Sequence, residues 1–222
     1  MEKMRQGGES TERRKRRARQ IESLLREKYP SASVALLHST PLQLLISVIL
    51  SAQCTDARVN MVTPALFKKY KTVDAFAHAN LSQLEREIYS TGFYRNKAKN
   101  IIECCKAVME RHSGEVPSSM DELIQLPGVG RKTANCVLSG AFDIASGIVV
   151  DTHVVRLTKR LGLTENSHPE KIESDLCKVI DRSDWIHFGN ALIHHGRKIC
   201  GARNPQCALC ILNKLCPSAS GQ

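Results

Sequence analysis

Helix-start signals recur along this chain, and they constrain its fold more than any other feature. Thr40-Pro41-Leu42-Gln43 has the order of a capping box with proline at the first helical position, directly before the apolar run Leu42–Leu50. Similar starts follow at Ser82-x-x-Glu85, Ser119-x-x-Glu122 and Ser167-x-x-Glu170. No stretch sustains the period-two alternation of a half-buried strand. The sequence therefore predicts an all-α protein of about ten helices.

The charge balance favours a polyanionic partner. The chain has 32 Lys and Arg against 22 Asp and Glu, a formal net charge of +10, which suits nucleic acid ahead of a membrane. Residues 1–20 hold eight cations and three anions, so +5 of this excess lies there. Both a solvated tail with a first helical turn and a phosphate-binding arm stay open for this segment.

No window approaches the roughly 20 apolar residues of a membrane span. The basic N-terminus also lacks the apolar segment of a signal peptide. We therefore expect a cytoplasmic, nucleoid-associated protein that does not contact a membrane.

A turn between two predicted helices carries two glycines and is followed by two cations. The helix that starts at Ser119 should end near Leu126, and Pro127-Gly128-Val129-Gly130 connects it to a helix that starts at about Arg131. The glycines permit positive φ and leave the backbone bare, so N–H groups at the helix start can form a concave anion site. A bound phosphate would offset the repulsion between the helix dipole and Arg131. A plain short turn is the alternative.

Lys132 lies one position further into this helix and has two interpretations. It could be a second phosphate-binding cation. It could also be an amine nucleophile, because the helix N-terminus, Arg131 and partial burial would each favour the neutral amine. The chemistry of the residues alone does not decide between them.

Asp151 opens the segment DTHVVRLTKRLGL, whose helix should end near Gly162. Aspartate is a favoured N-cap, worth about 1 kcal/mol. A capping carboxylate is also able to stabilise the positive sugar of an oxocarbenium-like transition state, so the two roles are compatible. His153 and Arg156 on the same helix are interpreted as packing and solvent residues.

The C-terminal region contains the spacing Cys200-x6-Cys207-x2-Cys210-x5-Cys216. Four cysteines this close together in a reducing compartment indicate a metal site, and the spacing alone leaves zinc and iron–sulfur open. The remaining cysteines fall within helical patterns and are interpreted as small core residues: Cys54, Cys104, Cys105, Cys136 and Cys177.

Taken together, "LPGVGRKTAN", "VVDTHVVRL" and the cysteine tail resemble the helix–hairpin–helix DNA glycosylases, most closely the endonuclease III family. The resemblance covers roughly residues 15–217. It implies a six-helix domain at 34–148 with the hairpin at about 119–140, and an iron–sulfur domain formed by 13–33 plus 149–222, with a cleft between the two. Residues 1–12 would be a flexible basic tail.

The resemblance also implies an activity. The protein would be a monomeric, bifunctional DNA glycosylase and abasic-site lyase of base excision repair. Its substrate would be double-stranded DNA with oxidised or ring-saturated pyrimidines or abasic sites. Lys132 would attack the sugar C1′, displace the base and form a Schiff base, and β-elimination would cleave the strand on the 3′ side. Asp151 would be the essential aspartate, and the four tail cysteines would hold one 4Fe–4S cluster.

Two further segments resemble the parts that fill the gap left by an extruded nucleotide. "SAQCTD" places Gln53 where the family has a gap-filling glutamine. "TGFYRNKA" places Phe93 at a loop tip where relatives carry an apolar wedge, often leucine, and phenylalanine should stack well there. Without the resemblance, Phe93 is equally well interpreted as a core aromatic.

Phosphate binding is the remaining implied role. In the loop between the first two tail cysteines, which is often strongly basic in relatives, only Arg203 is charged. Its phosphate contact therefore stays open, with Lys198, Lys214 or the basic N-terminus as substitutes. The resemblance assigns DNA contacts in the hairpin to Gly128, Val129, Gly130, Arg131 and Thr133.

Three alternatives stay open. A monofunctional mismatch glycosylase would share the fold, but those branches usually lack the lysine. A non-enzymatic DNA-binding module would use the hairpin and tail and leave Asp151 idle. A zinc-based scaffold would show no visible iron–sulfur absorption.

Overall fold

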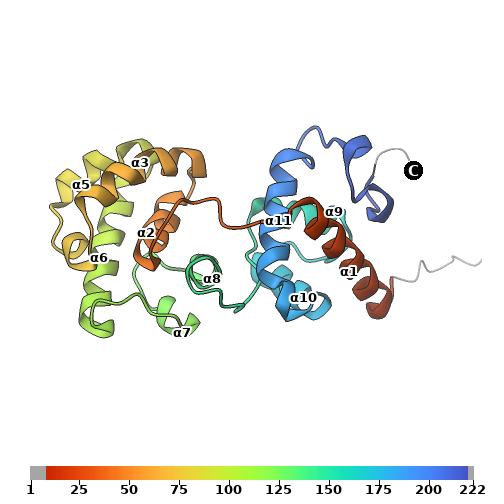
Figure 1. Cartoon of the computed structure of the whole chain (residues 1–222), viewed down its shortest axis with the longest axis horizontal. Coiled ribbons are helices and arrows are strands. Elements are labelled where there is room, and N and C mark those ends of the chain that lie inside the picture. Colours follow the sequence, from red (N-terminus) through yellow and green to blue (C-terminus); the bar gives the residue numbers. More distant parts are fainter. Residues whose placement is uncertain (1–8, 220–222) are drawn as a thin grey trace, which may run out of the picture. The chain divides into compact units, whose positions relative to one another are not determined.

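The computed structural model describes residues 9–219, and the chain is helical throughout that range (Figure 1). Eleven α-helices and four 3₁₀ helices form within the described residues. The β structure found there is one isolated bridge between Cys200 and Pro205. The all-α prediction is therefore confirmed. No helix within residues 9–219 is long and apolar enough to cross a bilayer.

The contacts divide the chain into two compact units, Val34–Ser146 and the combination of Met1–Ser33 with Gly147–Gln222. Most of the tail predicted for residues 1–12 lies outside the described residues. Its last two residues are helical, because Ser10 caps a helix that begins at Thr11.

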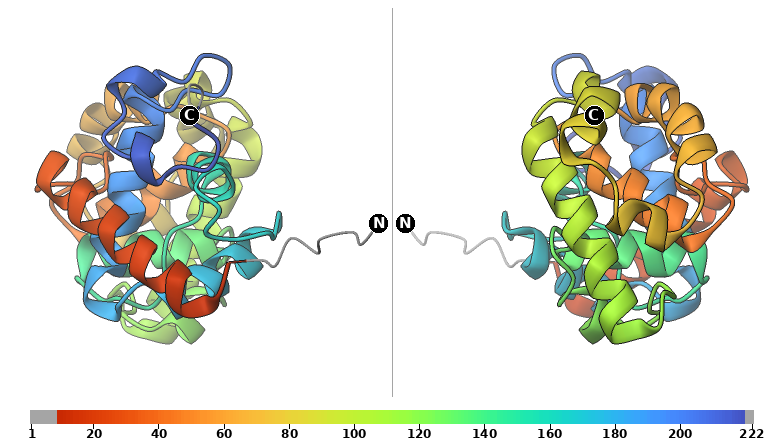
Figure 2. Two further views of the ribbon diagram at one scale, coloured as in Figure 1. Left: turned by 90° about the vertical axis from the view of Figure 1, so that its right-hand side faces the viewer. Right: turned by 90° about the vertical axis from the view of Figure 1, so that its left-hand side faces the viewer.

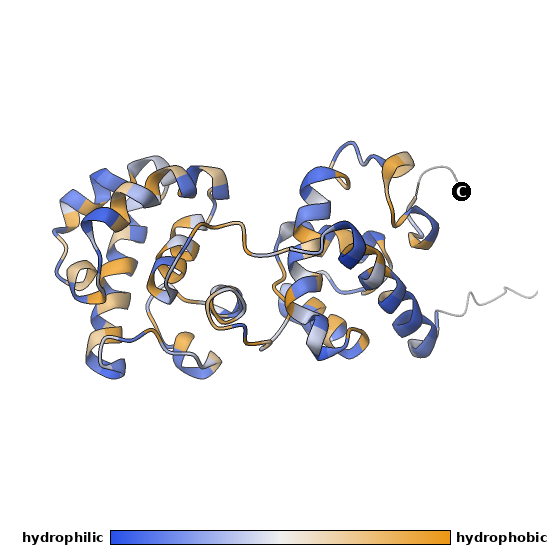
Figure 3. Ribbon diagram, viewed as in Figure 1, coloured by the Kyte–Doolittle hydropathy of each residue, from blue (hydrophilic) through white to orange (hydrophobic). Residues whose placement is uncertain are grey.

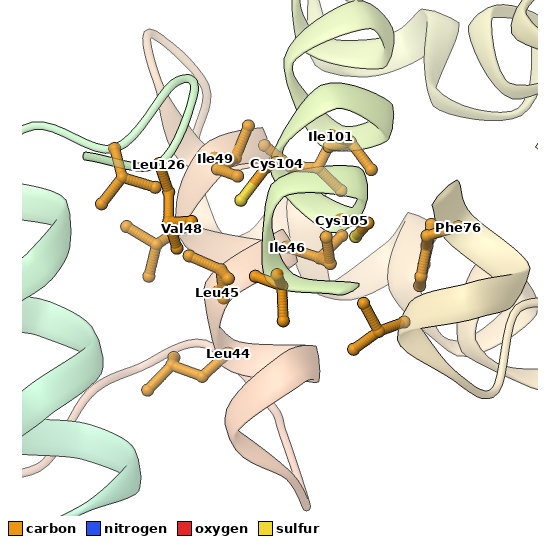
Figure 4. Close-up of a cluster of buried hydrophobic side chains, with 14 of the residues drawn as sticks. Leu44, Leu45, Ile46, Val48, Ile49, Phe76, Ile101, Cys104, Cys105 and Leu126 are labelled. Atoms are coloured by element: carbon orange, nitrogen blue, oxygen red, sulfur yellow. The ribbon is translucent and has the colours of Figure 1, made fainter. Parts of the chain in front are cut away.

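The unit Val34–Ser146 is built around one central apolar helix, α2. The elements of this unit are α2 (Pro41–Ser51), α3 (Asp56–Lys69), α4 (Val73–Ala77), α5 (Leu81–Ile88), η1 (Tyr89–Thr91), α6 (Tyr94–His112), α7 (Met120–Leu123) and α8 (Arg131–Ala141). Residues 44–50 of α2 are all buried, and α2 packs against α3, α6 and α8. Figure 4 shows side chains of α2 between those of α6 and of the α7–α8 connection. The long helix α6, yellow-green in Figure 2, also contacts α4 and α5.

The second unit brings the N-terminal helix onto the C-terminal part of the chain. Its elements are α1 (Thr11–Lys28), α9 (Thr152–Arg160), α10 (Pro169–Val179), η2 (Arg182–Asp184), α11 (Trp185–Lys198), η3 (Cys207–Leu209) and η4 (Asn213–Leu215). Helix α1 buries Ala18, Ile21 and Leu25 against α10 and α11, while most of its remaining residues are hydrophilic (Figure 3). The packing of this apolar stripe draws the N-terminal segment into the C-terminal unit.

The helix starts were predicted with mixed success. Thr40 caps α2, because its Oγ1 accepts a hydrogen bond from the Gln43 N–H. The prediction for Ser82 was wrong, because Asn80 caps α5 and the Ser82 hydroxyl donates to the Asn80 side chain. Helix α10 also starts later than predicted, at Pro169, with no side-chain cap.

Candidate functional site

The predicted hairpin is present, and its two glycines meet different requirements. Gly128 has φ +77°, and a Cβ there would lie 2.9 Å from Cβ of Asn100, so both backbone and packing demand glycine. Gly130 has φ −92°, and a Cβ there would meet nothing within 4 Å. The fold therefore tolerates a side chain at Gly130, and the bare backbone leaves room for a ligand instead.

The start of α8 presents backbone N–H groups to this bare surface. No side chain caps the helix at Gly130, and the N–H groups of a first turn have no acceptor within their own helix. Val129 stabilises the turn itself, because its side chain is buried and its N–H donates to the Leu126 carbonyl. N–H groups at the start of a helix can bind an anion, so the geometry of the hairpin is compatible with an anion site.

Lys132 lies in the first turn of α8 with an exposed side chain. The expectation of partial burial was wrong, because in α8 burial begins with Thr133 and Ala134, and Lys132 stays exposed. Arg131 beside it is also exposed, and Thr133 is half-buried. Exposure leaves the Lys132 amine accessible to a large substrate.

Asp151 is the N-cap of α9, as predicted. Its Oδ1 accepts hydrogen bonds from the His153 N–H at 2.8 Å and the Val154 N–H at 2.9 Å, and the residue is half-buried. Burial holds the pKa of His153 below its usual value. Arg156 is half-buried and donates to the carbonyls of Gly196 and Cys200, so of the two expected roles it has that of a packing residue.

Gln53 and Phe93 share an unusual backbone conformation. Gln53 follows α2 with φ 52°, and Phe93 precedes α6 with φ 47°. Such left-handed residues cost on the order of 1–3 kcal/mol each and cluster at functional sites. The Phe93 side chain is 63% exposed, so it is not a core aromatic.

The four tail cysteines line one cavity of about 300 Å³, together with Arg160 and the exposed Arg203. Within residues 9–219 no three cysteine, histidine or acidic side chains converge as a single metal ion requires. Zinc would draw four thiolates to about 2.3 Å around one point. A cavity lined by four thiols offers the donor set of a metal site, for which zinc and iron–sulfur are the two candidates.

Hydrogen-bond donors surround these sulfurs. Arg160 Nη1 lies 3.1 Å from Cys200 Sγ, and His195 Nε2 lies 3.2 Å from Cys210 Sγ. Burial raises the pKa of the Cys210 and Cys216 thiols, and the neighbouring cysteines add to the effect. Donors to sulfur stabilise the thiolate form that metal ligation needs.

Of the other five cysteines, Cys54 lies in a loop instead of the predicted helix.

The cations of α1 are partly used within the fold. Arg17 donates to the carbonyls of Leu161 and Gly162 at the end of α9, and it also pairs with Glu9. Arg19 lies 3.4 Å from a carboxylate oxygen of Asp181. This pairing accounts for part of the charge that suggested a phosphate-binding arm.

Known proteins are similar to this chain in sequence and in fold. The family described as HhH-GPD superfamily base excision DNA repair protein matches residues 46–182. The chain is 53% identical to endonuclease III of Synechocystis sp., over 93% of this chain and 94% of that protein. It is 41% identical to endonuclease III of Escherichia coli K12, over 90% of this chain and 95% of that protein. A non-covalent endonuclease III–DNA complex matches with a TM-score of 0.88 at 44% identity, over 92% of this chain and 96% of that one. A trapped endonuclease III–DNA covalent intermediate matches with the same values. The chain therefore belongs to the endonuclease III family within the HhH-GPD superfamily.

Proposed function

We propose that this protein is a bifunctional DNA glycosylase and abasic-site lyase. It removes oxidised or ring-saturated pyrimidines from duplex DNA and cleaves the abasic site that results. The observation that carries the proposal is that Lys132 is exposed in the first turn of α8, directly after the glycine turn. The chain also belongs to a family of this activity. A chromosomal substrate would bring the protein to the nucleoid.

Lys132 supplies the nucleophile. Its neutral Nζ attacks C1′, and the base leaves with the electrons of the glycosidic bond and takes up a proton. Opening of the sugar ring then gives a protonated Schiff base between Nζ and C1′. Loss of a C2′ proton breaks the C3′–O bond, which cleaves the strand on the 3′ side, and water finally hydrolyses the imine to release Lys132.

Asp151 supplies charge stabilisation. Its carboxylate, oriented by the cap bonds of α9, stabilises the positive sugar as the base departs and assists the proton transfers. A carboxamide would keep the cap but not the charge.

DNA binding divides between the hairpin and two loops. Gly128, Gly130, Arg131 and Thr133 bind a backbone phosphate, and Val129 completes the turn. Gln53 and Phe93 fill the gap that an extruded nucleotide leaves. Arg203 is a further phosphate contact.

The tail cysteines Cys200, Cys207, Cys210 and Cys216 hold one 4Fe–4S cluster, supported by their lining of one shared cavity of about 300 Å³. When bound, the cluster joins four points of the tail into one compact loop. Purified protein should show broad visible absorption and contain iron and sulfide in equal amounts. Zinc without visible absorption would contradict this assignment.

Borohydride trapping tests the chemistry. Wild-type protein should form a covalent product with duplex DNA that carries one abasic site or thymine glycol. Lys132→Ala should form none. Lys106→Ala is the matched control, because Lys106 is an exposed lysine of α6 that pairs with Glu103. If the wild type bound duplex DNA with a steep salt dependence but neither cut nor trapped it, a monofunctional glycosylase or a binding module would replace the lyase.

A further inference from the structure

Lys97 of α6 is a buried lysine with a specific pair of acceptors. Its side chain is 4% exposed, and its Nζ donates to the carbonyl of Leu50 at 2.8 Å and to that of Thr91 at 2.7 Å. Leu50 is the next-to-last residue of α2, and Thr91 is the last residue of η1. Each element leads into a loop that carries a left-handed residue, Gln53 after α2 and Phe93 after η1.

The end of α2 depends on Lys97. Three of its last four carbonyls accept hydrogen bonds from nearby residues. The Ser51 hydroxyl donates to the carbonyl of Val48, the Ala52 N–H to that of Ile49, and the Cys54 N–H to that of Ser51. The fourth, that of Leu50, accepts its hydrogen bond from Lys97 Nζ. An ammonium at a helix C-terminus is also favoured by the helix dipole.

Lys97 also holds the backbone on both sides of Phe93. Its Nζ bonds to the carbonyl of Thr91, and its backbone N–H donates to the carbonyl of Phe93 at 3.1 Å. Thr91 itself is buried, and its hydroxyl donates to the Ile88 carbonyl. The exposed ring of Phe93 therefore projects from a backbone that is fixed immediately before and after it.

The ammonium at this position is not an ion-pair partner. No carboxylate within the described chain forms a salt bridge with Lys97, and burial lowers its pKa, an effect that Cys54 nearby opposes. An apolar side chain of the same length would avoid the desolvation penalty of a buried charge. What the ammonium adds is a bridge between two carbonyls of different loops.

We propose that Lys97 is a positioning residue that fixes the Gln53 and Phe93 loops relative to one another, so that both side chains can enter the gap of a single extruded nucleotide. The inference rests on the gap-filling roles in the proposed function. Strained left-handed residues persist only where the surroundings determine them. Loops that are already fixed also need no ordering when DNA binds.

A double-mutant cycle on duplex DNA with one abasic site tests this role. Lys97→Met keeps the length of the side chain and removes both donated bonds. In the wild-type background it should lower kcat/KM about tenfold or more. In the Gln53→Ala/Phe93→Ala background it should have less than about a twofold effect, because the groups that Lys97 positions are gone. The control variant Lys106→Met should leave kcat/KM unchanged in both backgrounds.

The contrary outcomes separate the two proposals. Equal losses from Lys97→Met in both backgrounds would show a merely structural role and overturn the inference. No loss from Gln53→Ala/Phe93→Ala would instead overturn the gap-filling roles, and an inactive wild type would overturn the proposed function. If Lys97→Met does not fold, the cycle is run with Lys97→Gln, whose shorter side chain cannot bridge both carbonyls.

Discussion

The Asp151 carboxylate and the Val154 backbone are joined by a 2.9 Å hydrogen bond, and the same oxygen, Oδ1, also accepts from His153. One carboxylate thus caps α9 and is proposed to act on the sugar. The two roles can be separated, because capping needs an acceptor oxygen whereas the chemistry needs a negative charge.

Asp151→Asn should therefore retain stability and lose activity. Asparagine caps about as well as aspartate, so the free energy of unfolding should change by less than about 0.5 kcal/mol, whereas Asp151→Ala should cost about 1 kcal/mol. The loss of charge should lower the rate of base removal about 100-fold or more. Urea unfolding and single-turnover kinetics measure the two effects. Full activity of Asp151→Asn would show that the residue acts only as a cap.

Alanine at Gly128 should lower the stability of the protein, whereas alanine at Gly130 should lower its affinity for DNA. Gly128→Ala meets positive φ and Cβ of Asn100 at 2.9 Å, so it should destabilise the protein by about 1–3 kcal/mol. Gly130→Ala meets no atom within 4 Å, so stability should hold while affinity for duplex DNA falls. Thermal unfolding and a binding titration distinguish them. Unchanged DNA affinity of Gly130→Ala would place the phosphate elsewhere.

Arg17 should contribute to stability and not to DNA affinity. Arg17→Met removes donors to the carbonyls of Leu161 and Gly162, which should cost about 1–3 kcal/mol. The dependence of DNA binding on salt concentration should stay the same. Arg16→Met, which changes an exposed cation of the same helix, serves as the stability control. A shallower salt dependence of Arg17→Met would assign Arg17 to phosphate binding.

Asp175 should make stability depend on pH in acid. Burial alone would raise the pKa of its carboxyl, but hydrogen bonds from Thr164 and Asn166 and the charge of Lys178 lower that pKa overall. A lowered carboxyl pKa stabilises the fold above the unfolded value of about 3.9, and this contribution is lost as the pH falls through the folded value. Asp175→Ala should therefore be less stable than wild type by about 2 kcal/mol at pH 7. This difference should shrink below pH 4. A difference that is constant with pH in denaturant titrations would contradict an electrostatic origin.

Local patterns in the sequence determined the features that depend on neighbouring residues. The helical class, the cap at Asp151 and the glycine turn before α8 all follow from contacts within a few positions. The cysteine spacing indicated a metal site for the same reason, because its ligands lie close together in the chain. The error at Ser82 was local, because Asn80 two positions earlier is itself a favoured cap. The error in the exposure of Lys132 arose because burial depends on packing and not on a local signal.

Only the tertiary structure decided the roles of several cations. Lys97 stands in "RNKAKN" between other polar residues, and nothing there indicates burial. Its acceptor at Leu50 is 47 positions away, and the Leu161 acceptor of Arg17 is 144 positions away. A sequence shows that a lysine or arginine has donors. Which distant carbonyl receives them depends on how the helices pack, because long-range hydrogen bonds form only after the apolar faces have brought those segments together.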